Sequence, residues 1–221
     1  MLVRMWMTET VKTVEPQTPI LDALHLMKEQ HFRRLPVLDK KGTLVGLVTE
    51  SDIKTAAPPR KKGASVWEIT EQMTHMTVED VMTLAEDLIT VSPNEPVEEA
   101  ALQMHRNKIG SLLVLDDEKL VGIITESDVL EVLMELMGVQ RGGTRLTLEI
   151  LNRPGALTQA LNILKQHDVN ILSIVTCRHC SENPRHGVIV IRLDLADWHG
   201  ILKSLKDEAI EVLDVREATK G

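Results

Sequence analysis

The chain has 221 residues, enough for one or two ordinary domains or three small ones, and its formal net charge of −8 argues against sequence-independent binding to nucleic acid or to an anionic membrane. No apolar run reaches the roughly 18–20 residues of a membrane-spanning helix, and the first ten residues lack the apolar stretch of a signal peptide. Because two cysteines do not make a disulfide framework, we expect a soluble, cytoplasmic protein.

The first two-thirds of the sequence repeat with a period of about 76–77 residues. Residues 11–27 and 88–104 share Thr, Val, two Pro, Ala and Met in step, and GLVTESD at 46–52 returns as GIITESD at 122–128. This pattern predicts a duplicated domain. Each copy reads as a short extended segment, an amphipathic helix, two strands joined by a polar turn, and a helix after TESD. Between the copies, the segment 66–82 predicts a helix that leads into the second copy.

After Gly142 and Gly143 the pattern changes to that of a third domain. A strand with alternating apolar residues is followed by a turn and an amphipathic helix, two strands, a second helix and a last strand. The expected order is therefore βαββαβ, the split-βαβ arrangement. The strands are expected at 144–150, 170–177, 187–195 and 210–215, and the second helix is expected to begin at about Asp197.

The repeated TESD segment has two interpretations. Thr-x-x-Asp ahead of an apolar run is a helix-capping pattern, in which the side chains bond free backbone N–H groups. The same junction of a strand end and a helix start can bind an anion, with the Thr hydroxyl on a phosphate oxygen and the Asp on a ribose diol. A third interpretation is that the Asp takes part in nucleotide hydrolysis, which turnover of bound ATP would reveal. The residues alone leave these alternatives open.

The duplicated unit, with its Met-Thr pairs, RLPVLD and GLVTESD, resembles the CBS domain, and the tandem pair resembles a Bateman module. This resemblance implies two βαββα repeats that bind an adenosyl ligand: AMP, ADP or ATP, or else NAD or S-adenosylmethionine. It implies that Thr49 and Asp52 hold the phosphate and ribose in one site, and Thr125 and Asp128 in the other. The adenine would be gripped where the first strand of each copy ends, at Thr13, Val14, Thr90 and Val91.

The two copies differ just before the second strand pair. Copy one has Arg33 and Arg34, where related nucleotide sensors carry phosphate-binding residues, whereas copy two has Gly and Ser with Lys108 a little earlier. These basic residues are candidates for phosphate contacts in a shared cleft. The alternative is that they are solvated surface charges. In either case we expect the two sites to be inequivalent.

The LNRPGAL turn in a βαββαβ frame resembles the ACT domain, which often pairs side by side and binds an amino acid at the seam. That resemblance implies ligand contacts at Asn152, Gly155, Ala156 and Leu157, or a domain that serves only for dimerisation. The order CBS–CBS–ACT is similar to that of AcuB-type acetoin utilisation proteins, which implies a regulatory role. The whole chain is then an α+β protein with CBS domain 1 at 1–57, a linker with a helix at 58–76, CBS domain 2 at 77–139 and an ACT domain at 144–217.

A cluster of cysteine and histidine near residue 180 is a weak candidate for a metal site, with suitable ligand types. Its members are Cys177, His179, Cys180 and His186. No Ser–His–Asp arrangement, Walker loop or Rossmann fingerprint occurs. We therefore expect a non-catalytic homodimer without a cofactor, which senses an adenine nucleotide through the CBS pair. The alternative is an amino-acid sensor that uses the ACT domain, with the CBS pair as a scaffold.

Overall fold

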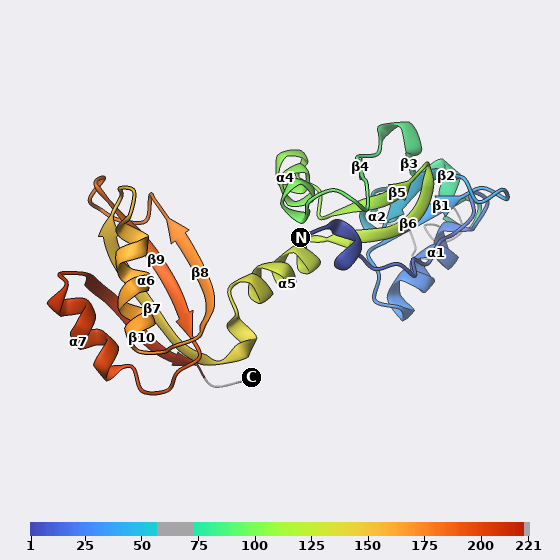
Figure 1. Ribbon diagram of the computed structural model, residues 1–221. Coiled ribbons are helices and arrows are strands. Elements are labelled where there is room, and N and C mark those ends of the chain that lie inside the picture. The colour runs from blue at the N-terminus through green and yellow to red at the C-terminus, as the bar shows by residue number, and fades with distance from the viewer. Residues whose placement is uncertain (57–72, 219–221) are drawn as a thin grey trace, which may run out of the picture. The chain divides into compact units, whose positions relative to one another are not determined.

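The computed structural model describes residues 1–56 and 73–218, and these divide into two compact units, Met1–Val129 and Leu130–Gly221 (Figure 1). Each unit is described by itself. Among the described residues, no helix is both long enough and apolar enough to cross a membrane.

The first unit contains the two sequence copies, each with a helix, two antiparallel strands and a second helix. The repeat therefore encodes the same succession of elements twice. In copy one these are α1 (Ile20–Glu29), β1 (Arg34–Leu38), β2 (Leu44–Thr49) and α2 (Glu50–Ala56). In copy two they are β4 (Thr90–Val91), α4 (Val97–Asn107), β5 (Ser111–Asp116), β6 (Lys119–Thr125) and α5 (Glu126–Leu136), the last of which extends beyond this unit.

The segment that precedes each copy pairs with the strands of the other copy. Strand β3 (Thr83–Leu84) precedes copy two but pairs with β2, so that one sheet has the order β1-β2-β3. Reciprocally, Thr8 forms a bridge to Ile123 in β6. The hydrophobic core of copy one likewise includes Val78, which is fully buried. This exchange joins the two copies into one folding unit.

Part of the helix expected at 66–82 lies outside the described residues. In the described part, Met73 and Thr74 are helical, but the helix does not continue to residue 82, because Val78–Asp80 form a separate short 3₁₀ helix, which corrects the sequence prediction. The reason is local, because Thr77 is extended (φ −109°, ψ 168°) and forms a capping box with Asp80. A capping box marks the start of a new helix, so a continuous α-helix cannot run through Thr77.

The second unit is a four-stranded antiparallel sheet covered by two helices on one face (Figure 1). The chain order is βαββαβ and the spatial order is β10-β7-β9-β8, as in a ferredoxin-like fold. This confirms the predicted α+β class and the order of elements. The elements are β7 (Gly143–Leu151), α6 (Ala156–Gln166), β8 (Ile171–Cys177), β9 (His186–Leu193), α7 (His199–Asp207) and β10 (Glu211–Ala218).

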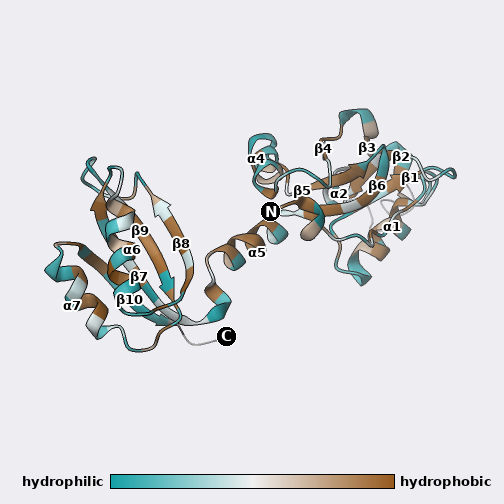
Figure 2. Cartoon of the chain, in the orientation of Figure 1, coloured by the Kyte–Doolittle hydropathy of each residue, from teal (hydrophilic) through white to brown (hydrophobic). Residues whose placement is uncertain are grey.

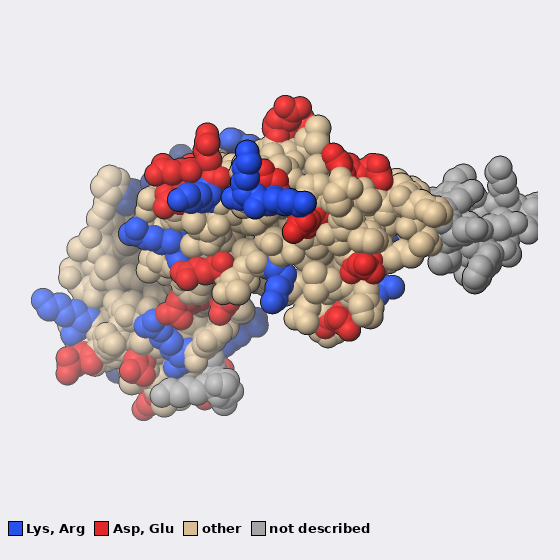
Figure 3. Space-filling model, turned by 90° about the vertical axis from the view of Figure 1, so that its right-hand side faces the viewer, with Lys and Arg blue, Asp and Glu red and all other residues tan. Residues whose placement is uncertain are grey.

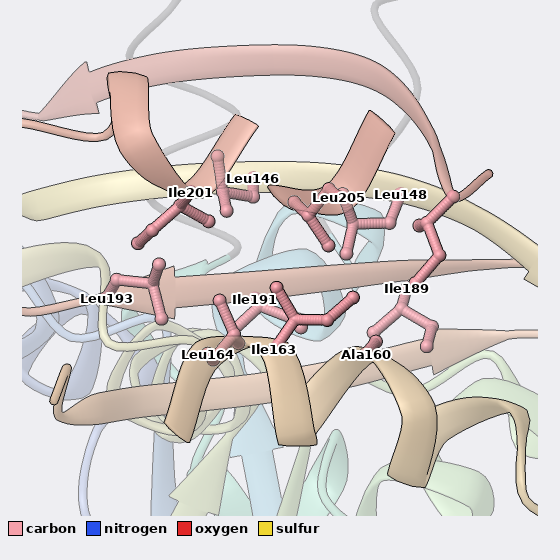
Figure 4. Packing of buried hydrophobic residues seen from close by; sticks show 11 residues of the cluster. Leu146, Leu148, Ala160, Ile163, Leu164, Ile189, Ile191, Leu193, Ile201 and Leu205 are labelled. Atoms are coloured by element: carbon pink, nitrogen blue, oxygen red, sulfur yellow. The ribbon is translucent and has the colours of Figure 1, made fainter. Parts of the chain in front are cut away.

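The core of this unit lies between the sheet and the helices (Figure 4). Ala160 and Leu164 on α6 are one helical turn apart, and both are fully buried against the sheet. Alternate residues of the strands point to the same face, as Leu146 and Leu148 do on β7. Figure 2 shows the result, with mostly apolar strands β8 and β9 and hydrophilic loops at their ends.

Candidate functional site

The TESD segment of each copy begins at a strand end and continues into a helix. The Thr49 N–H and Oγ1–H both donate to Asp52 Oδ2, at 2.8 and 2.7 Å, and the Asp52 N–H donates to Thr49 Oγ1 at 3.2 Å. Thr125 and Asp128 repeat this pattern at 2.7, 2.8 and 3.3 Å. The capping interpretation therefore describes the local geometry. Within the described residues, these bonds use only one carboxylate oxygen of each Asp, Oδ2.

A third Thr-x-x-Asp segment has the same hydrogen bonds without the same surroundings. The Thr77 N–H and Oγ1–H donate to Asp80 Oδ2 at 2.8 and 3.1 Å. Neither of these residues lines a cavity formed by a TESD segment. Capping geometry alone thus does not distinguish a binding site, and the cavities beside the TESD segments do.

The first of these cavities, called here the Thr49 cavity, has a volume of about 430 Å³. Thr49, Glu50, Ser51 and Asp52 of copy one line one side. Copy two contributes an apolar wall made of Leu88, Ile89, Ile109 and Leu113. The volume lies within the roughly 300–1,000 Å³ of small-molecule sites, and an apolar wall opposite a few polar groups is their usual composition.

The second, called here the Thr125 cavity, has a volume of about 400 Å³. Thr125, Glu126 and Ser127 of copy two line it, whereas Asp128 does not line it directly but is bonded to Thr125. Copy one contributes the other wall, with Thr10, Val11, Lys12, His31 and Phe32. Each cavity is therefore built from the TESD segment of one copy and from corresponding segments of the other.

Four residues that were expected to grip adenine lie outside both cavities. The Val14 N–H donates to Pro36 O, and Val14 O accepts from the Leu38 N–H, both at 3.0 Å. Thr90 and Val91 likewise pair with β5. Because sheet pairing uses these main-chain groups, they are not free for a base. The cavity walls instead include residues a few positions earlier, which are Thr10, Val11, Lys12, Leu88 and Ile89, while Thr13 and Val14 line a separate depression.

Lys108 also lies outside both cavities. It is the C-cap of α4 in the left-handed conformation, with φ 58°.

Two residues of the cavity walls were not predicted from the sequence. They are Phe32, which is 40% exposed and lines the Thr125 cavity, and its counterpart Ile109 in the Thr49 cavity. The repeat alignment places these two residues at matching positions, which is a signal that could have identified them.

Arg33 and Arg34 line both cavities, as does Gly110. The Arg34 guanidinium donates to Ser111 Oγ, the residue at the matching position of copy two. Partial burial lowers the pKa of Arg34, the charge of Glu126 raises it, and the charge of Arg33 lowers it. An arginine held at the boundary of two cavities is a suitable donor to a phosphate in either of them.

The acidic residues of the two TESD segments have different surroundings. Glu50 Oε1 lies 2.7 Å from Lys54 Nζ, and this hydrogen bond and charge hold the pKa of Glu50 below its ordinary value. Glu126, at the matching position, has Leu130 four residues later in place of a lysine. On the face shown in Figure 3, basic and acidic side chains are interspersed.

The turn of the second unit that was expected to bind an amino acid lies beside a smaller cavity of about 270 Å³. Of its predicted ligand residues, only Ala156 lines this cavity. The Asn152 N–H donates to Arg185 O at 2.8 Å, and the Leu157 side chain packs against the core. Gly155 has φ +86° and is the N-cap of α6. The polar residues that line the cavity are Glu149, Arg153, Gln159, His186, Glu208 and Glu211.

The proposed metal cluster is not formed. Cys177 and Cys180 are joined by a disulfide, which removes both thiolates as ligands. Among the described residues, no group of three or more His, Cys, Asp or Glu side chains is arranged to hold a metal ion. The candidates His179 and His186 therefore remain ordinary residues of the β8–β9 loop and the start of β9. The disulfide was not anticipated from the cysteine count.

Comparison with known proteins agrees with this architecture. Homoserine O-acetyltransferase of Methanococcoides burtonii is 34% identical over 124 residues, which are 56% of this chain and 22% of that enzyme. The chain spans about a fifth of the length of the first curated relatives that it matches.

Two solved structures are also similar. One, from Vibrio cholerae, is described as an acetoin utilization protein (AcuB); it is 29% identical over 64% of this chain and 96% of that one, with a TM-score of 0.53. The other is CBSX2, a CBS-pair protein of Arabidopsis thaliana, in complex with AMP. It is 28% identical over 61% of this chain and 97% of that one, with a TM-score of 0.50.

Family models account for most of the sequence. The CBS domain model matches residues 3–58 and 78–135, and the TTHA0829-like ACT domain model matches residues 142–216. These matches confirm the tandem CBS pair and the ACT domain expected from the sequence. Since the CBS model alone covers more than half of the chain, the protein belongs to the CBS-domain family, as a tandem CBS pair followed by an ACT domain.

Proposed function

We propose that this chain is a regulatory protein without chemistry of its own, which binds adenosyl nucleotides in the Thr49 and Thr125 cavities. The observation that carries this proposal is the composite construction of both cavities. A ligand that contacts TESD of one copy and the apolar wall of the other binds best in one arrangement of the two copies. Binding therefore shifts the population toward that arrangement, which is the physical basis of regulation.

The comparisons support an adenosyl ligand. CBSX2 is similar to this chain and has been solved with AMP. We propose AMP, ADP or ATP as ligands, with NAD and S-adenosylmethionine as alternatives that an Asp on the ribose would also accept. The homoserine O-acetyltransferase relative matches only the CBS region, so its reaction is not assigned to this chain. We further propose a cytoplasmic homodimer, since CBS pairs and ACT domains both favour self-association.

The first experiment is calorimetric titration of AMP into the full chain and into three Asp→Ala variants. Asp52→Ala and Asp128→Ala each remove a helix-capping carboxylate that is also a candidate ribose acceptor. Asp80→Ala removes a carboxylate that accepts the same kind of hydrogen bond from Thr77 but lines neither cavity. All three are expected to lose about 0.5–2 kcal/mol of folding stability. The Asp52→Ala/Asp128→Ala double variant is expected to lose AMP binding by at least about tenfold, since hydrogen bonds to a charged group contribute about 1.5–3 kcal/mol. Asp80→Ala is expected to bind AMP as the wild type does.

If the double variant binds AMP as tightly as Asp80→Ala does, both TESD segments are helix caps alone and the proposal fails. It fails also if the wild type binds none of AMP, ATP, NAD and S-adenosylmethionine. Hydrolysis of ATP by the wild type, lost in the double variant, would contradict the absence of catalysis.

A second candidate function is the sensing of an amino acid by the ACT domain. It is favoured by the cavity beside the LNRPGAL turn, which is lined by Arg153 and by acidic residues, groups suited to the two charges of a zwitterion. An Arg153→Ala variant would then lose amino-acid binding and keep AMP binding. If the wild type binds no amino acid and AMP binding is lost in the Asp variants, the result supports the first proposal over this one. The part played by acetoin metabolism rests on the similarity to AcuB and is likewise a proposal.

A further inference from the structure

The two cavities compete for one pair of arginines. Arg33 and Arg34 line both of them, and the matching residues of copy two, Gly110 and Ser111, supply no charge. Arg34 is held between Ser111, which lines the Thr49 cavity, and Glu126, which lines the Thr125 cavity. A phosphate that engages these guanidinium groups from one cavity therefore withdraws them from the other.

The remaining charges of the cavities are unequal. At one pair of matching positions the Thr125 cavity has Lys12 where the Thr49 cavity has Ile89. At another it has Thr10 where the Thr49 cavity has Asp87. Lys12 and Asp87 line their cavities, so each charge lies beside a ligand that occupies that cavity.

The acidic residue that follows Thr in each TESD segment does not cancel this difference. Glu50 is paired with Lys54, and the charge of Glu126 interacts favourably with Arg34. Asp52 and Asp128 have matching hydrogen bonds, but only Asp52 lines its cavity, which adds to the negative charge of the Thr49 cavity. After these pairings, the Thr125 cavity keeps an extra cation and the Thr49 cavity keeps an extra anion.

We propose that the two cavities divide ligands by charge: the Thr125 cavity binds the phosphorylated adenine nucleotide, and the Thr49 cavity binds an adenosyl compound without phosphate. This inference rests on the proposed function and assigns a ligand class to each of its two sites. The shared arginines serve the phosphate in the Thr125 cavity. The Thr49 cavity, left with Asp52 and Asp87 beside an apolar wall, favours an uncharged or cationic adenosyl group.

AMP and adenosine differ only in the phosphate and are the matched probes for this proposal. Calorimetry on the full chain is expected to show one tight AMP site per chain, and one adenosine site in protein already saturated with AMP. Asp128→Ala is expected to weaken the AMP site, and Asp52→Ala the adenosine site. A Thr10→Asp/Lys12→Ile variant, which gives the Thr125 cavity the charges of the other, is expected to lose AMP affinity by about tenfold.

The Asp87→Thr/Ile89→Lys variant gives the Thr49 cavity the charges of the Thr125 cavity. It is expected to strengthen AMP binding in the Thr49 cavity by about tenfold and to produce a second measurable AMP site. Lys40→Asp is the control for the first exchange, because Lys40 is exposed and lies outside both cavities, and its replacement changes the net charge by −2, as Thr10→Asp/Lys12→Ile does. Two equal AMP sites in the wild type, or loss of the single AMP site in Asp52→Ala alone, would overturn the division by charge and leave the proposed function standing. Absence of binding by both AMP and adenosine would overturn the division by charge, and the proposed function fails as well if ATP, NAD and S-adenosylmethionine do not bind either.

Discussion

Replacement of Gly143 with alanine is expected to unfold the beginning of β7 and to cost about 3–5 kcal/mol of stability in the second unit. Gly143 has φ +79°, and a Cβ added there would lie 2.1 Å from Leu193 O. That carbonyl belongs to β9, the neighbour of β7, while β10 lies on the other side. The strand therefore cannot move away from the clash without breaking a sheet ladder.

Gly155→Ala is the matched control for this variant. Gly155 also has a positive φ, +86°, but an added Cβ would meet nothing within 4 Å. It is expected to cost only the backbone strain, about 1 kcal/mol. Urea denaturation of the full chain and hydrogen exchange of amides in 144–151 measure both effects. Equal losses for the two variants would show that positive φ alone, and not the contact with Leu193 O, makes Gly143 necessary.

The architecture of the second unit could be predicted because its signals are local. The alternation around Leu146 and Leu148 and the helical spacing of Ala160 and Leu164 are visible in the sequence, and each element packs as its own pattern requires. The Gly142-Gly143 boundary was also visible. The contact with Leu193 O was not, because it depends on the register between β7 and β9, which are far apart in the chain.

The candidate site was predictable in part for the same reason. The repeat identified Thr49, Asp52, Thr125 and Asp128 as a set, since each lies where a strand pattern changes to a helix pattern. A repeat does not show which copy a flanking segment pairs with, because either pairing satisfies the same local pattern. Sequence reasoning therefore missed the exchanged segments, and with them the contribution of Thr8 to one cavity and of Thr83 to the other.

The glycines that open the two TESD heptapeptides test this exchange of segments. A Cβ on Gly46 would lie 2.6 Å from Thr83 O and 2.7 Å from Met82 Sδ. A Cβ on Gly122 would lie 2.7 Å from Met7 Sδ and 3.0 Å from Thr8 O. The main-chain conflict is thus severe at Gly46 and mild at Gly122. Gly46→Ala is expected to cost about 2–3 kcal/mol and Gly122→Ala about 1 kcal/mol, measured by urea denaturation.

A second substitution separates side-chain from main-chain conflicts. The Met7 side chain can move, so Met7→Ala is expected to remove most of the additional loss due to Gly122→Ala. Met82→Ala removes the conflict with the Met82 side chain but leaves the conflict with Thr83 O in place. It is therefore expected to recover only part of the stability that Gly46→Ala loses. Full relief in both cycles would show that the Met side chains alone require glycine.

The position of Thr83 connects this stability argument to binding. Thr83 lines the Thr49 cavity, as its counterpart Thr8 lines the Thr125 cavity, and the conflict of Gly46→Ala is with Thr83 O. Displacement of Thr83 in Gly46→Ala is therefore expected to weaken adenosine binding in the Thr49 cavity while AMP binding in the Thr125 cavity is retained. Because Gly46 and Asp52 belong to one heptapeptide, residues 46–52 then serve two purposes: the glycine admits the segment from the other copy, and Thr49 and Asp52 line the cavity that this segment helps to form.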